Sequence, residues 1–255
     1  MCVNAKVLKV VVSTLLFLAV LVNAEPKSVA VEKPAPLALL NVWMYPLFGE
    51  RITRSKFSPV AVELEQLLDK PVSLSVSNDF VQVEQLAKAG ELDIFLAGNG
   101  PLARKLVAEE YFVKALSAEL SILLYSKLPE AEIKLLGVPV NTMAEVLRAK
   151  DYADYPYVTY DNFLPMYKAY LAGEIDAMLV GKVSFYLLPE KIKNKDHIRR
   201  EIKGEGEGVI LFSKRFSLTA DAKHAQQYFL QHKSAAGYFF GHDMGVEHWE
   251  IATEL

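Results

Sequence analysis

Short apolar runs alternate with amphipathic helical patterns along most of this chain, and no other feature of the sequence constrains the fold as strongly. Each run of strand length is followed by a segment with apolar residues at helical spacing. Such alternation predicts an α/β fold with mostly parallel sheets. Strands are expected at 37–45, 72–76, 92–97, 137–140, 155–160 and 175–180. Helices are expected from Ser58 and Pro59 to 68, at 79–89, 101–106, 162–172 and 220–238, and after Asn141 and Thr142.

Two further apolar runs, 120–125 and 208–213, are expected to cross between two α/β blocks as strands, the second after a glycine-rich turn at 204–208. The phrase GELDI at 90–94 is nearly repeated as GEIDA at 173–177, a helix stop leading into a buried strand, once in each block. We therefore expect two lobes joined by two crossing hinge strands. Lobe 1 comprises 37–120 and 214–255, and lobe 2 comprises 121–213 including the hinge strands.

The first 24 residues have the plan of a secretory signal, with Lys6 and Lys9 before an apolar run and small residues ending at Ala24. An uncleaved membrane anchor is the alternative. Cleavage would remove Cys2, the single cysteine, which excludes thiol chemistry in the mature chain. A flexible leader is expected at 25–36. The net charge of −3, without a basic cluster, argues against a nucleic-acid partner. A periplasmic, monomeric protein is expected.

Several stretches carry a resemblance to a known family. These are 57–67, the phrase AKAGELDIFLAG leading to Gly100 and Pro101, and the phrase KAYLAGEIDAMLVG. Over 37–245 the chain resembles the type II periplasmic solute-binding proteins, most of all the phosphate, phosphite and phosphonate receptors of ABC transporters. The resemblance implies the two-lobed type II fold and capture of a small anionic ligand in an interlobe cleft, for delivery to an inner-membrane permease. A sensory partner protein, an amino-acid-type receptor and a scaffold without ligand are the alternatives.

Ligand contacts are expected where strands end and helices begin, because unpaired N–H groups and the helix dipole favour anions there. The candidates are Tyr45, Asn99, Gly100, Arg104, Asn141, Thr142, Tyr160 and Asp161. Arg104 can make a bidentate contact to a carboxylate or phosphate. In the amino-acid receptors of the same superfamily, an Arg close to that place holds the substrate carboxylate. Lys182 and Ser184 are weaker candidates. Ordinary capping and packing are the competing interpretation for each of them.

A candidate metal site lies near the C-terminus, where His242, Asp243, Glu247 and His248 have side chains able to bind zinc or copper. Their spacing fits no known motif, so a solvated turn is the preferred interpretation and no metal or cofactor is expected. The G-x-S-x-G, H-E-x-x-H and Walker A patterns do not occur. The sequence therefore predicts a binding protein and not an enzyme.

Overall fold

The computed structural model describes residues 38–46, 49–186, 193–231 and 249–255. The first α/β block comprises β1 (Leu40–Met44), α2 (Glu50–Leu68), β2 (Val72–Val76), α3 (Phe80–Ala89), β3 (Ile94–Gly98) and α4 (Pro101–Ala108). The second comprises β5 (Leu136–Pro139), α5 (Met143–Asp151), β6 (Tyr157–Tyr160), α6 (Phe163–Ala172), β7 (Ala177–Gly181) and α7 (Lys182–Tyr186). The long strands β4 (Phe112–Ser126) and β8 (Ile198–Ser213) connect the blocks, and α8 (Lys214–Ser217), α9 (Ala220–Gln231) and β9 (Glu250–Ile251) follow.

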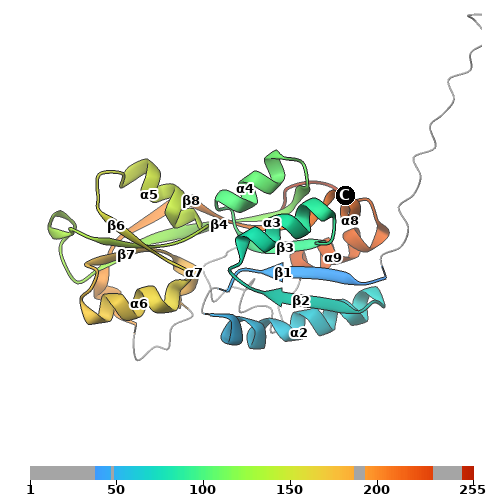
Figure 1. Cartoon of the computed structure of the whole chain (residues 1–255), viewed down its shortest axis with the longest axis horizontal. Helices are drawn as coiled ribbons and strands as arrows, with labels where there is room; N and C mark the ends of the chain where they lie inside the picture. Colours follow the sequence, from blue (N-terminus) through green and yellow to red (C-terminus); the bar gives the residue numbers. More distant parts are fainter. Residues whose placement is uncertain (1–37, 47–48, 187–192, 232–248) are drawn as a thin grey trace, which may run out of the picture. The chain divides into compact units, whose positions relative to one another are not determined.

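All the strands of the described residues belong to one sheet, ordered β2-β1-β3-β8-β4-β7-β5-β6, with β9 added on β4. The pairs β1–β2, β1–β3, β5–β6 and β5–β7 are parallel, whereas every pair that involves β4 or β8 is antiparallel. The two crossing strands pair with each other for most of their length and thereby join the two parallel blocks (Figure 1). The predicted α/β class and the two crossing strands are confirmed.

Alternate side chains of the strands enter cores on opposite faces of the sheet, as the period of a strand requires. Next to β1 and β3, one core holds α2 and α9 against Val42 and Leu96, and the other holds α3 and α4 against Trp43 and Phe95. Next to β5 and β7, α6 covers one face and α5 covers the other. Each block is thus a three-layer arrangement with helices on both faces, and we call them the first half and the second half.

The repeated phrase forms the same structure in both halves. Gly90 and Gly173 cap α3 and α6 in the left-handed conformation, with φ of 70° and 76°. The Asp that follows accepts hydrogen bonds from the backbone of the neighbouring segment: Asp93 from the N–H of Asn41 (2.9 Å), and Asp176 from the N–H groups of Lys134 and Leu135 (2.9 and 3.0 Å). The predicted helix stops and buried strands are confirmed.

The predicted start of the first helix was wrong. Helix α2 begins at Glu50, and Pro59 lies inside it. The hydroxyl of Ser58 donates to the carbonyl of Arg54 (2.8 Å) instead of capping the helix. Pro59 cannot donate the usual backbone hydrogen bond. The turns before it are nevertheless helical, because Phe57, 1% exposed, packs into the core from there.

The glycine-rich stretch at 204–208 was predicted as a turn, and this was also wrong, because it lies within β8. Gly206 packs so closely on β4 that a Cβ atom would lie 2.2 Å from the carbonyl oxygen of Leu120. Next to it the register shifts, so that Leu120 pairs with Gly206 but Ile122 with Ile202, and Gly204 has a φ of 71°. The glycines therefore form a bulge in a crossing strand rather than a connection before it.

Several predictions fall outside the described residues: the signal segment at 1–24, the leader at 25–36, the end of the last helix beyond Gln231, and the histidines His242 and His248. Within the part of the chain that is described, no helix combines the length and apolar character needed to cross a bilayer. The same residues contain no group of three or more His, Cys, Asp or Glu side chains arranged to hold a metal ion.

Candidate functional site

A cavity of about 130 Å³ lies where strand ends from both halves meet the middle of the crossing strands. The carboxyl ends of β1 and β3 contribute from the first half, and those of β5 and β7 from the second. Residues 120–122 of β4 and 206–209 of β8 also contribute to the wall. This is the edge at which open α/β sheets bind ligands, because the helix amino termini that follow the strands face it.

Three of the predicted site residues line the cavity, namely Tyr45, Asn141 and Thr142, as does the weaker candidate Ser184. The Tyr45 hydroxyl donates a hydrogen bond to the carbonyl oxygen of Asp161 in the second half (2.7 Å). Burial raises the pKa of Tyr45 above its usual range, and the nearby carboxylates of Asp161 and Glu145 raise the pKa further. Tyr45 therefore stays a neutral donor at any physiological pH.

The amino terminus of α5 faces the cavity. Met143 and Ala144 of its first turn line the wall, and the first N–H groups of a helix have no partner within the helix. The Thr142 hydroxyl donates to the carbonyl of Pro139 (2.8 Å), while the Glu145 carboxylate accepts from the N–H of Asn141 (2.7 Å). Thr142 therefore provides no side-chain cap for the start of α5, which lies at the cavity wall.

The amino terminus of α4 is placed differently, because Asn99, Gly100 and Arg104 lie outside the cavity wall. Gly100 packs on the backbone of Asn141 and Thr142, which lead into α5. A Cβ atom at this position would lie 2.1 Å from the carbonyl oxygen of Asn141. The Arg104 guanidinium donates to the carbonyl of Asn99 (3.0 Å) and lies 3.5 Å from the sulfur of Met143. These residues form a contact between the two halves beside the cavity.

The last two candidates also lie outside the wall. Asp161 is exposed, and its contribution is the carbonyl that receives the Tyr45 hydroxyl. Tyr160 packs against the core beneath α6, and this burial raises the pKa of its phenol.

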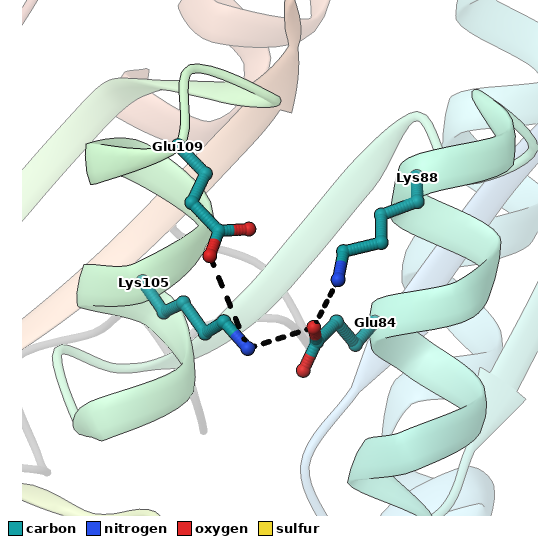
Figure 2. Close-up of polar contacts among 4 residues, drawn as sticks. All are labelled: Glu84, Lys88, Lys105 and Glu109. Carbon is teal, nitrogen blue, oxygen red and sulfur yellow. Dashed lines mark hydrogen bonds and ion pairs between the residues drawn. The ribbon is translucent and has the colours of Figure 1, made fainter.

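Ion pairs fix α4 on the outside of the first half. Glu84 of α3 accepts from Lys88 on its own helix (2.5 Å) and from Lys105 on α4 (2.7 Å), and Lys105 also lies 3.9 Å from Glu109 (Figure 2). The hydrogen bonds from Lys105 and then Lys88 lower the pKa of Glu84 to about 2. This network holds the two helices together on the solvent side of the core that they share.

Most wall residues were not among the candidates from the sequence, and two of them, Glu207 and Trp249, have side chains that matter for the chemistry of the cavity. Glu207 lies in β8, where its carboxylate accepts from Lys114 (2.7 Å) and from the side-chain amide of Asn99. Trp249 comes from the segment just before β9. The glycine-rich pattern around Glu207 could have indicated a close strand crossing instead of a turn. No signal in the sequence places Trp249 here, because its position depends on a contact with β4 more than 130 residues away.

The chemistry of the wall is dominated by apolar groups. Hydroxyl and amide groups come from Tyr45, Ser121, Asn141, Thr142 and Ser184. Among the described residues that line the cavity, Glu207 carries the single charge, and Lys114 pairs with it. The wall can therefore hold a small solute by backbone dipoles, neutral donors and apolar contact.

The chain has the two-lobed fold seen in solved periplasmic binding proteins. One similar structure is PhnD1 from Prochlorococcus marinus in complex with methylphosphonate, with a TM-score of 0.68 and 12% identity over 85% of this chain and 93% of that one. Another is the binding component of an ABC phosphonate transporter from Pseudomonas aeruginosa, with a TM-score of 0.60 and 11% identity over 85% and 82%. A third is the periplasmic VFT2 domain of BvgS from Bordetella pertussis, with a TM-score of 0.53 and 13% identity over 80% and 97%.

The sequence comparisons add nothing to this likeness, since no family model and no curated sequence matched the chain. At such low identities the structures establish the fold. One of them is the binding component of a phosphonate transporter, one is bound to methylphosphonate, and one is a periplasmic domain of BvgS.

Proposed function

We propose that this protein is a periplasmic solute-binding protein that captures a small, phosphonate-like anion in the cavity and presents it to an inner-membrane ABC permease. The observation that carries the proposal is the composition of the cavity wall, which takes strand ends from both halves and includes the first turn of α5. A ligand that contacts both halves stabilises their closed arrangement, and this is how binding can be reported to a membrane partner.

The wall favours an organic oxyanion over an inorganic one. The first-turn N–H groups of α5 can donate hydrogen bonds to anionic oxygens. The mostly apolar remainder of the wall suits an alkyl group and offers inorganic phosphate little to replace its hydration. The negative charge of Glu207 is offset by Lys114 at 2.7 Å, which lowers its repulsion of an anion.

In this proposal the site residues divide into two groups. Tyr45, Asn141 and Thr142 contact the ligand. Asn99, Gly100, Arg104, Tyr160 and Asp161 surround that site, and several of them hold the halves together through the contacts described above. The lobes extend over 37–120 with 214–255 and over 121–213, and they move about the bulge where β4 and β8 cross. The protein acts as a monomer without cofactor or catalysis.

Export is part of the same proposal. Residues 1–24 act as a cleaved signal peptide and 25–36 as a leader, so that the binding lobes reach the periplasm. The chain beginning at Glu25 is therefore the form to test in solution.

A sensory role is the second candidate, and the likeness to the BvgS domain favours it. Here the ligand-bound form would contact a membrane signalling protein instead of a permease. An amino-acid-type ligand is the alternative within the transport role. Both alternatives use the same cavity, so the ligand and the partner distinguish them.

A thermal-shift screen of the chain from Glu25 tests the proposal. The panel contains methylphosphonate, ethylphosphonate, methanesulfonate, phosphate, phosphite, sulfate, and acidic and neutral amino acids. We expect an alkylphosphonate at a hundredfold excess over its dissociation constant to add about 2.7 kcal/mol to the free energy of unfolding. Phosphate and sulfate are expected to give smaller shifts. A response to amino acids alone would contradict the phosphonate assignment, and no response to any solute would contradict the binding function.

A further inference from the structure

The last residues of the chain form a strand on the crossing strand β4. Glu250 pairs with Ser117 and Ile251 with Leu116, and the N–H of Ala252 donates to the carbonyl of Ala115 (3.1 Å). The terminal segment is therefore held in place at several points.

Helix α9 adds a further anchor. The side-chain amide of Gln226, 3% exposed, donates both to the carbonyl of Ala115 (2.9 Å) and to that of Thr253 (2.8 Å). Ile251 and Leu255 pack against the core between α2, α9 and the sheet. A buried amide bridging β4 and the terminal segment fixes the position of that segment relative to β4, because an unpaired buried amide is costly.

This position places Trp249 in the cavity wall. Strand β7 pairs with the same edge of β4 further along, from Ile122 onward, and β9 pairs up to Ser117. The stretch of β4 between them contributes Leu120 and Ser121 to the cavity. Trp249 comes just before β9 and also lines the cavity, so its indole lies at this interruption in the pairing.

Gly208 leaves the room that the indole needs. A Cβ atom at Gly208 would lie 3.3 Å from Cη2 of Trp249 and 3.2 Å from Cδ1 of Leu120, tighter than most packed contacts. The indole therefore packs on the bare backbone of β8, with Leu120 beside it. The indole borders the cavity volume of about 130 Å³, so any ligand bound at the start of α5 lies in a space that this ring limits.

We infer that Trp249 is a specificity-determining residue, which the C-terminal strand places in the wall to limit the length of the ligand's apolar group and to give that group an aromatic surface. The inference rests on the proposed function and deepens it, since it predicts a short alkyl chain. Indole is the largest side chain and loses little conformational freedom when it is held by its neighbours, which suits it to set the size of a small site.

The test compares a series from methyl- to pentylphosphonate on the wild type, Trp249→Ala and Trp249→Phe by titration calorimetry. Removing the indole contact is expected to weaken methylphosphonate about tenfold. The same change is expected to reverse the order of the series in favour of the longer chains, while Trp249→Phe keeps the wild-type order. Glu250→Ala, at an exposed neighbouring position, serves as the matched control and should leave the series unchanged.

A spectroscopic arm keeps the inference testable if Trp249→Ala does not fold. The other tryptophan, Trp43, is 2% exposed and stacks on Phe95 at 4.9 Å in a separate core. In Trp43→Phe the emission comes from Trp249 alone, and a bound alkylphosphonate is expected to change its intensity and its quenching by acrylamide.

The two failures can be told apart. Two results would overturn the role of Trp249 while the wild type still binds the series: Trp249→Ala keeps the wild-type order of chain lengths, or the bound alkylphosphonate leaves the emission of Trp249 unchanged in Trp43→Phe. Either result leaves the proposed function standing. Failure of the wild type to bind any member of the series would overturn the proposed function, and the specificity role with it.

Discussion

The two halves use the same device at the end of a helix and complete it differently. After Gly90 in the first half and Gly173 in the second, an Asp carboxylate accepts hydrogen bonds from backbone N–H groups, in β1 for the first half and just before β5 for the second. Asp93 is fully buried and also pairs with Arg215 of α8 (2.8 Å), whereas Asp176 is partly exposed and bonds to residues of its own half. The first half therefore needs the chain that returns after β8, and the second half is complete within one continuous stretch.

The halves also differ at the helix starts that face each other. Gly100 at the start of α4 lies against the backbone of Asn141 and Thr142 and outside the cavity wall, while Thr142 and Met143 at the start of α5 also line the cavity. Both of these strand-to-helix turns thus take part in the contact between the halves, and only the turn before α5 also forms part of the cavity wall. This division could not be inferred from either turn taken alone.

The largest expected effect separates the two aspartates. Asp93→Ala removes the partner of the Asn41 N–H and of Arg215, and we expect the free energy of unfolding to fall by about 3 kcal/mol. Urea unfolding of the chain from Glu25 measures this. Arg215 belongs to the returning chain, and Arg215→Ala removes one of the two partners of Asp93. This variant is therefore expected to show part of the destabilisation caused by Asp93→Ala. A loss below about 1 kcal/mol for Asp93→Ala would break the comparison, since that is the scale of an ordinary hydrogen bond.

The counterpart in the second half is expected to be weaker. Asp176→Ala removes two backbone hydrogen bonds from a partly exposed carboxylate, so water can replace part of what is lost. We expect a loss of about 1.5 kcal/mol in the same urea experiment. A loss of stability equal to that of Asp93→Ala would show that the ion pair with Arg215 of the returning chain adds nothing to the stability that the aspartate provides.

The contact between the halves is expected to contribute about as much as one hydrogen bond. Tyr45→Phe removes the bond to the Asp161 carbonyl, which is worth about 1 kcal/mol, and leaves an oxygen on an exposed residue that water can reach. Ligand affinity should fall by about fivefold, because the closed arrangement loses this bond in the ligand-bound form. Calorimetric titration checks this, with Tyr160→Phe as the control outside the cavity wall. Unchanged ligand affinity in Tyr45→Phe would show that the hydrogen bond between Tyr45 and Asp161 does not contribute to ligand binding.

The smallest expected effect depends on pH and concerns the first half alone. Lys105 and Lys88 hold the pKa of Glu84 at about 2, below its usual value of 4.5. The stabilisation is therefore present in full above about pH 4.5 and is lost as pH falls towards 2. Glu84→Gln should flatten the stability profile slightly in that window, and added salt should weaken the wild-type effect. A Glu84→Gln profile that stays parallel to the wild-type profile would contradict this origin of the shift.

Local signals in the sequence were reliable where a single residue decides the structure. Asp79 and Asn162 accept from the N–H of Gln82 and Leu164 at 3.0 and 3.1 Å, as residues at helix starts should. The signal at Ser58 and Pro59 misled because tertiary packing of the preceding turns outweighs the missing hydrogen bond of proline.

The parts that could not be predicted depend on contacts between distant segments. The bulge at 204–208 exists because β8 meets β4 there, and Glu207 faces the cavity as a result. Trp249 reaches the wall through β9, whose two residues carry no strand pattern of their own. Of the predicted cluster, Tyr45, Asn141 and Thr142 line the cavity, whereas the contact of Gly100 with Asn141 places the α4 residues outside the wall.

The central claim is that a solute occupies the cavity between the halves, and a blocking side chain tests it most directly. A Cβ atom at Gly181, which lines the cavity, would meet nothing within 4 Å, so a leucine there should fill the space without disturbing the fold. In a calorimetric titration with the alkylphosphonate that binds best, Gly181→Leu should keep the wild-type melting temperature and lose all detectable heat of binding. Thr159→Leu, on exposed β6, should bind as the wild type does. Binding of unchanged affinity in Gly181→Leu would contradict the account.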